Sequence, residues 1–146
     1  MRDFYSIAQP VAALLLWTMV MYFWMYATRI PAILKAGYDI RTMRGTTAGD
    51  LDKSLPPEVQ WKAHNYNHLL EQPMLFYAAC FLLLAVRETD ELALALAWTY
   101  VALRIVHSLV QATVNVIILR FPLFLLASIA LLGLILRTAR AVFSGS

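Results

Sequence analysis

Four apolar stretches take up most of the chain, and each is long enough to cross or nearly cross a lipid bilayer. They cover about residues 7–27, 69–86, 92–118 and 121–136. A spanning helix needs about 20 apolar residues, so we expect the shorter second and fourth stretches to continue as helix into the membrane interface. Because 61% of residues are hydrophobic and only 14% charged, a soluble domain could not cover this apolar surface. The sequence predicts an all-α, multi-pass integral membrane protein: a single-domain four-helix bundle over residues 1–146, with a long first loop.

The distribution of basic residues predicts the orientation in the membrane. Four spans place both chain ends on one side, opposite the first and third loops. More Lys and Arg fall on the loop side (Arg29, Lys35, Arg41, Arg44, Lys53, Lys62 and Arg120) than on the terminal side (Arg2, Arg87, Arg137 and Arg140). Cytoplasmic loops are enriched in these residues, so we expect the first loop, residues 29–55, to be cytoplasmic. The net charge of +3 indicates topology rather than nucleic-acid binding, and no nucleic-acid partner is expected.

Short polar segments predict where the helices begin and end. Pro56 and Pro57 with Glu58 indicate a helix start outside the bilayer, because proline is tolerated in the first turn and a carboxylate favours the positive helix end. Residues 87–91 are charged and predict a tight turn to the third helix. Pro122 is expected to mark the start of the fourth helix.

Polar side chains recur on one face of the second and third spans. On the third span they are Tyr100, Arg104, His107, Ser108, Gln111 and Asn115; on the second they are His64, Asn67, His68 and Glu71. Residues at this spacing share a helix face. An ionisable group at bilayer depth costs at least about 2.5–3.5 kcal/mol on insertion scales, and such groups often mark functional sites. The two faces are therefore the candidate site.

Residue counting places the two polar faces at a similar depth. Glu71 and His107 each lie 15 residues, or about 22 Å, from the 87–91 turn, so we expect Glu71 to contact Arg104 or His107. Three interpretations remain open: a purely structural network between helices, a ligand-binding or catalytic site, and a metal site using histidines and Glu71. The metal site is the weakest, because the chain has only 3 histidines.

Pro73 lies inside the second span and cannot donate a hydrogen bond to the carbonyl of Leu69. Proline is common in membrane helices, where it often produces only a kink. The alternative interpretation is that the kink opens space beside Glu71.

Two segments resemble a known family. The run WKAHNYNHLLEQPMLFY (residues 61–77) resembles the Arg-Ala-His, Asn, Glu, Pro signature of the MAPEG family, the membrane-associated proteins of eicosanoid and glutathione metabolism. The run ALRIVHSLVQATVNVIILRFPLF (residues 102–124) resembles the family's Arg, Tyr, Tyr, Arg pattern. The resemblance covers the whole chain. It implies a homotrimer in which glutathione binds between subunits near the cytoplasmic face and a lipophilic substrate enters from the bilayer.

The second span follows the family signature only in part. Lys62 and His64 match the Arg-Ala-His start, with lysine in place of arginine, and Pro73 matches the proline. Tyr66 and Leu69 fall at the positions of the family's asparagine and glutamate, so that Asn67 and Glu71 are displaced by one and two positions. Two positions on a helix turn a side chain to the other face.

The third span keeps one arginine and lacks the tyrosines. Arg104 matches the family's arginine, whereas His107 and Gln111 stand at the positions of the glutathione-binding tyrosines. Arg120 lies near the position of the thiol-activating arginine. The pattern resembles a divergent bacterial-type branch, which suggests a bacterial inner membrane.

Two functions follow as hypotheses, and the sequence leaves open whether the protein is an enzyme. The first is a glutathione-dependent transferase or peroxidase acting on lipophilic substrates. The second is a non-catalytic membrane protein that binds lipid or quinone or stabilises a larger membrane complex. In the first, Arg120 and Arg104 are the candidate catalytic residues, and the candidate ligand-binding residues are Lys62, His64, Asn67, His68, Glu71, His107, Gln111 and Asn115.

Overall fold

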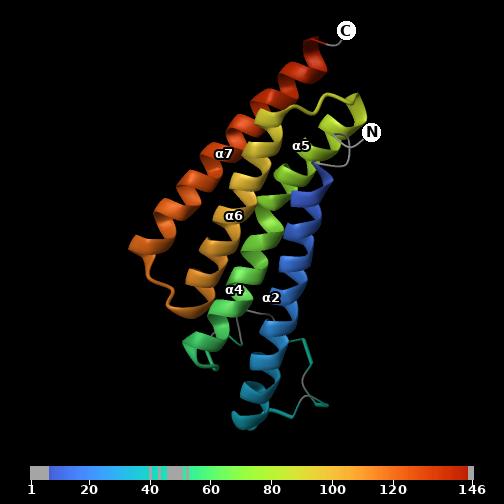
Figure 1. Cartoon of the computed structure of the whole chain (residues 1–146). Helices are drawn as coiled ribbons and strands as arrows, with labels where there is room; N and C mark the ends of the chain where they lie inside the picture. The colour runs from blue at the N-terminus through green and yellow to red at the C-terminus, as the bar shows by residue number, and fades with distance from the viewer. Residues whose placement is uncertain (1–6, 40, 43, 46–50, 52, 145–146) are drawn as a thin grey trace.

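The structure, a computed structural model, describes residues 7–39, 41–42, 44–45, 51 and 53–144. Its helices are α2 (Ala8–Lys35), α4 (Pro57–Glu71), α5 (Pro73–Val86), α6 (Glu91–Thr113) and α7 (Ile117–Ser144) (Figure 1). Because α4 and α5 follow one another along a single span, the described chain has 4 candidate membrane spans. The predicted four-helix membrane architecture is confirmed.

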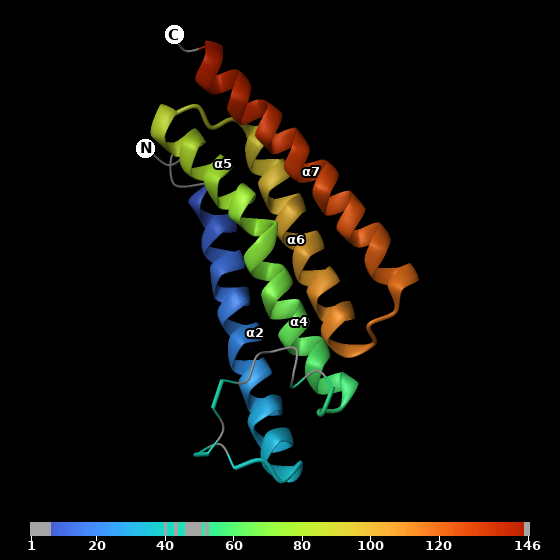
Figure 2. The same ribbon diagram turned by 180° about the vertical axis from the view of Figure 1, so that it is seen from behind.

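The spans run antiparallel along the chain. The start of α2 and the end of α7 lie at one end of the bundle, called here the terminal end (Figures 1 and 2). The α2–α4 connection and the short α6–α7 turn lie at the other, called here the loop end. This arrangement agrees with the predicted placement of both chain ends on one side.

The first helix is longer than predicted. It continues past residue 27 to Lys35, so the first loop begins at residue 36 rather than 29. Arg29 and Pro31 therefore belong to the helix. Neither residue ends it, because the backbone hydrogen bonds of the helix continue on both sides of them. The chain leaves the helix at Gly37, whose φ of 79° is costly for residues with a Cβ. Residues 40, 43, 46–50 and 52 of the predicted loop lie outside the described residues.

The next two boundaries agree with the sequence. Helix α4 begins at Pro57 with Glu58 in its first turn. Helix α5 ends at Val86, where Arg87 adopts a left-handed conformation, and α6 begins at Glu91. The Asp90 carboxylate caps α6 by accepting a hydrogen bond from the backbone N–H of Ala93 at 2.8 Å.

The boundary between the third and fourth spans was predicted wrongly. Helix α6 ends at Thr113, not residue 118, and α7 begins at Ile117, so Pro122 lies inside α7 rather than at its start. The turn is made by Asn115, whose φ is 50°. Asparagine adopts this left-handed conformation more readily than most residues. The sequence pattern did not predict the turn, because Asn115 lies within an apolar run.

Helix α6 lies at the centre of the bundle and packs against α2, α4 and α7. The core between the helices contains large apolar side chains, with the rings of Phe76 and Tyr100 stacked at 4.8 Å between centroids. At the terminal end α7 also packs against α5, and towards the loop end it diverges from α4 (Figures 1 and 2). This divergence leaves room for a pocket at the loop end.

Candidate functional site

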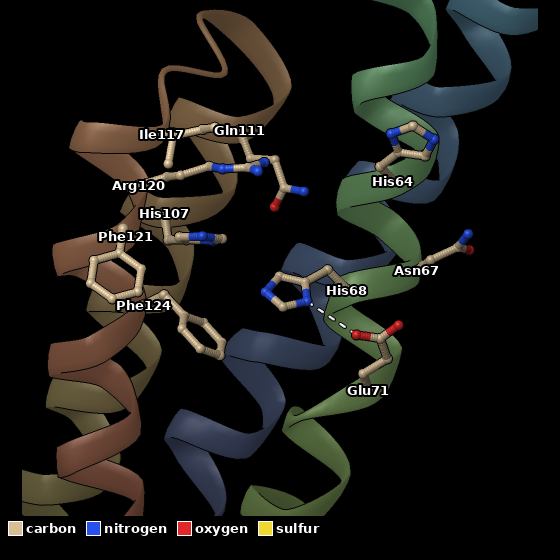
Figure 3. A pocket seen from close by; sticks show the side chains of 10 residues that line it. All are labelled: His64, Asn67, His68, Glu71, His107, Gln111, Ile117, Arg120, Phe121 and Phe124. Carbon is tan, nitrogen blue, oxygen red and sulfur yellow. Dashed lines mark hydrogen bonds and ion pairs between the residues drawn. The ribbon is translucent and has the colours of Figure 1, made fainter. Parts of the chain in front are cut away.

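A pocket of about 480 Å³ lies where α7 diverges from α4, with α6 between them (Figure 3). Each helix contributes one group of lining side chains: His64, Asn67, His68 and Glu71 from α4, His107 and Gln111 from α6, and Ile117, Arg120, Phe121 and Phe124 from α7. Seven of the ten candidate site residues named from the sequence therefore line one pocket: His64, Asn67, His68, Glu71, His107, Gln111 and Arg120.

The α6 wall presents polar atoms that lack partners. His107 is 3% exposed and Gln111 is 6% exposed. Among the described residues, neither the Nδ1 atom of His107 nor the Oε1 atom of Gln111 has a hydrogen-bond partner. Buried polar atoms are nearly always paired, with protein groups or with ordered water. His107 and Gln111 thus line the pocket, while these two polar atoms are themselves buried behind its surface.

The α4 wall carries a histidine–carboxylate pair. The Nδ1 atom of His68 lies 3.2 Å from Oε2 of Glu71, and these residues are three positions apart on the helix. The His68 ring extends into the pocket towards α7, whereas Asn67 points away from α6 and α7 (Figure 3). The rings of Phe124 and His107 lie 5.3 Å and 5.4 Å from the His68 ring, measured between centroids. These contacts fix the His68 ring within the pocket.

The α7 wall carries the cation of the pocket. Nη1 of Arg120 donates a hydrogen bond to Oδ1 of Asn115 at 2.7 Å. Asn115 does not line the pocket, and it contributes by making the α6–α7 turn and by holding the guanidinium. The positive charge of Arg120 is therefore fixed at the pocket wall rather than free to move in solvent.

Arg104 lies behind the pocket wall and is fully buried. Its Nη2 donates to the backbone carbonyl of His68 at 2.9 Å, and its guanidinium lies 5.8 Å from the ring centroid of Phe124. That carbonyl is next to the carbonyl of Leu69, which Pro73 leaves without its usual helical donor. Arg104 thus supports the helix where α4 gives way to α5.

The expected contact of Glu71 with Arg104 or His107 is not found. Among the described residues the ion-pair partner of Glu71 is His68 on its own helix, and the Glu71 side chain is 70% exposed. Residue counting along the helices gave the depth of Glu71 but not the direction in which its side chain points. The Glu71 side chain is thus exposed, whereas Arg104 is fully buried.

Lys62 is outside the pocket. Its Nζ donates to the carbonyl of Glu58 at 2.8 Å and lies 5.6 Å from the ring centroid of Trp24. No group of three or more His, Cys, Asp or Glu side chains placed to hold a metal occurs in the described part of the chain.

Two polar residues that the sequence analysis did not select hold the helices together. Asn65 is fully buried, and its Nδ2 donates to Oγ of Ser108 at 2.6 Å. Gln72 stands at the break between α4 and α5, and its Nε2 donates to Oγ of Ser128 at 2.8 Å. The signal for Asn65 was its helical spacing from Leu69, which is also buried.

The sequence profile of the MAPEG family matches residues 7–140. No curated protein and no solved structure matches the chain. Since the match covers nearly all of the described helices, the chain belongs to the MAPEG family.

Proposed function

We propose that this MAPEG-family membrane protein binds a small thiol of the glutathione type in the pocket between α4, α6 and α7, and that it transfers the thiol to lipophilic electrophiles. The observation that carries the proposal is Arg120, a cation held at the pocket wall by Asn115. A thiol loses its proton more readily beside a fixed cation, and the thiolate is the reactive nucleophile.

The pocket has groups that fit the polar parts of such a cofactor. The side chains of His107 and Gln111 line the pocket, and imidazole and amide groups can form hydrogen bonds with the polar groups of a cofactor. Arg120 can bind a carboxylate or stabilise a thiolate. When bound, glutathione supplies the sulfur nucleophile, while these residues orient it.

The apolar side of the pocket fits a lipophilic substrate. Ile117 and Phe121 line the pocket and are 68% and 60% exposed at the outer face of α7. In a membrane this face meets lipid or a neighbouring subunit. A substrate dissolved in the bilayer therefore has an apolar route to the polar groups of the pocket.

We expect glutathione to bind weakly. His107 and Gln111 replace the tyrosines expected from the family pattern, and Asn67 points away from α6 and α7. A thermal-shift titration tests this expectation: stabilisation should require millimolar glutathione, and strong stabilisation at micromolar concentration would show that the site is better adapted to glutathione than we propose.

The catalytic proposal is tested with the whole protein in mild detergent and an aryl halide as the electrophile. Arg120→Met should lower kcat/KM for glutathione by about 100-fold, in the range typical of losing one electrostatic contact to a developing anion. Arg140→Met is the matched control, because Arg140 lies on the same helix at the terminal end, and it should react like the unaltered protein.

The same preparation tests the alternative function. Mass spectrometry of molecules that co-purify in mild detergent would reveal a bound quinone or lipid. Two results together would overturn the catalytic proposal in favour of a non-catalytic binding protein. The first is a co-purified molecule that protects Phe121 and Phe124 from chemical labelling, and the second is the absence of thiol transfer to any electrophile.

A further inference from the structure

The histidine–carboxylate pair of α4 has a geometry that the proposed binding role does not use. We infer that His68 is the general base that removes the proton from the bound thiol, with Glu71 as its positioning residue. This inference rests on the proposed function, because it assigns a role within the same pocket. It adds a proton acceptor to the fixed cation Arg120.

The first step of the argument is the state of the His68 ring. An ionised carboxylate only accepts hydrogen bonds. Because Oε2 of Glu71 lies 3.2 Å from Nδ1 of His68, the neutral ring carries its hydrogen on Nδ1. The lone pair is then on Nε2, the atom that takes up a proton. A carboxylate fixes the tautomer in the same way in the Ser-His-Asp triad.

The second step is the direction of Nε2. The Nδ1 edge of the ring faces Glu71, and the opposite edge points into the pocket towards α7 (Figure 3). Phe124 and His107 lie beside the ring, and the backbone of His68 is held by Arg104. The ring is therefore held in place with its basic atom facing the space that the thiol would occupy.

The third step separates His68 from the other histidine that lines the buried wall. His107 is 3% exposed and has no carboxylate partner among the described residues, so nothing there offsets the cost of a positive charge. His68 has Glu71 beside it, which stabilises the imidazolium that forms. The other charged or titratable groups that face His68 are Arg104 and His107 on α6 and Arg120 on α7.

The reaction balances without any further reagent. Nε2 of His68 accepts the thiol proton, and Arg120 stabilises the thiolate left behind. The sulfur electron pair forms a bond to the electrophilic carbon, and with an aryl halide the halide leaves with the electron pair of the broken bond. His68 then releases its proton to solvent, so the net products are the thioether, halide and a proton.

The kinetic test compares His68→Gln and Glu71→Gln with the unaltered protein in detergent. His68→Gln should lower kcat/KM at pH 7 by about 100-fold, within the range for general-base catalysis, while KM for glutathione stays the same. Activity should recover as pH rises towards the ordinary thiol pKa of about 8.5, because the thiol then ionises unaided.

The second variant, Glu71→Gln, should show a smaller loss of kcat/KM with the same recovery at high pH. The control variant Glu91→Gln, at the opposite end of the bundle, should show no loss of kcat/KM. A His68→Gln enzyme with normal kcat/KM from pH 6 to 9 would overturn the inference.

A second measurement does not depend on turnover. Nitrogen NMR of the protein with ¹⁵N-labelled histidine, with His68 assigned by its loss in His68→Gln, should place the hydrogen of neutral His68 on Nδ1. Glu71→Gln should remove that preference. A hydrogen on Nε2 would overturn the assignment of His68 as the base. If no thiol reacts but the Nδ1 tautomer is found, the thiol-transfer proposal fails, while the positioning of His68 by Glu71 is supported.

Discussion

Ser108 shows that the polar face of the third span serves two purposes. Its Oγ accepts hydrogen bonds from Nδ2 of Asn65 at 2.6 Å and from Nε1 of Trp17 at 3.0 Å, so it joins α6 to α4 and α2. The preceding residue, His107, lines the pocket instead. The structural network and the ligand site are therefore neighbouring sectors of one helix rather than exclusive alternatives.

Ser108→Ala should destabilise the protein. The change leaves the buried Asn65 amide and the Trp17 indole N–H without their acceptor, and an unsatisfied buried donor costs about 1–3 kcal/mol. Thermal melting in one detergent should show a clearly lower Tm. Ser144→Ala, at the exposed end of α7, is the control, and equal Tm values for the two variants would contradict the assigned role of Ser108.

Glu71→Ala should be mild in the same melting experiment. A pair three residues apart on a helix contributes about 0.2–0.5 kcal/mol, and the Glu71 side chain is 70% exposed. The pair with Arg104 predicted from the sequence would instead cost about 3–5 kcal/mol when broken. A loss of Tm larger than that of Ser108→Ala would mean that Glu71 has a buried partner in the assembled protein.

At the scale of helices, the site depends on two interruptions of helical structure. One is at Gln72, between α4 and α5, beside the carbonyl that Arg104 contacts. The other is the turn at Asn115, which starts α7 early enough to place Arg120 in the pocket. The helix assignment is interrupted at Pro73, but the backbone at Gln72 keeps helical dihedral angles, with φ of -61° and ψ of -37°. That a kink at Pro73 opens space beside Glu71 stays a prediction.

Two substitutions of Asn115 should separate its two roles. Asn115→Gly should preserve stability, because glycine adopts a positive φ freely, and should lower thiol transfer, because Arg120 loses its anchor. Asn115→Val should lose both, since a β-branched residue pays about 1–2 kcal/mol in the left-handed conformation that asparagine and glycine adopt more readily. Melting and kinetic measurements on the two variants test these expectations. A fully active Asn115→Gly variant would exclude a role for Asn115 in anchoring Arg120.

At the scale of the whole molecule, the described outer surface is largely apolar, as in a membrane protein, and the polar pocket between α4, α6 and α7 opens onto it. Exposed apolar side chains cover α7, among them Ile118 at 78% and Leu136 at 61%. The carboxylate of Glu71 is also exposed, near the start of the apolar stretch 69–86. A charge that faces lipid is costly, so this side needs water, a ligand or another subunit.

We predict a homotrimer in which the side of the pocket that carries Glu71 faces a water-filled cleft beside a neighbouring subunit. The family resemblance suggests three subunits, and the exposed carboxylate supports an interface or wet cleft at this place. Native mass spectrometry from gentle detergent should show a trimer. Monomers or dimers alone would refute this prediction, and additional unrelated subunits would indicate a larger membrane complex.

We predict that the loop end faces the cytoplasm, because the loop side carries more basic residues. In a Cys80→Ala background, Arg44→Cys in intact cells should resist an impermeant thiol reagent, and Ser144→Cys should react. Arg44 is preferred to Gly45, whose φ of 65° would strain a cysteine. The reverse labelling pattern would show that the protein has the opposite orientation.

The sequence by itself determined the spans, the common side of the chain ends and most residues of the pocket. These features follow from hydropathy and from helical spacing, which are properties of the chain read in order. Tertiary structure alone decided the direction in which each side chain points and the residues that it contacts. Glu71 turned outward to His68, Lys62 lay outside the pocket, and Asn65 proved to be buried. Helical spacing gives the angle between residues of one helix, but the rotation of one helix against another is set by packing.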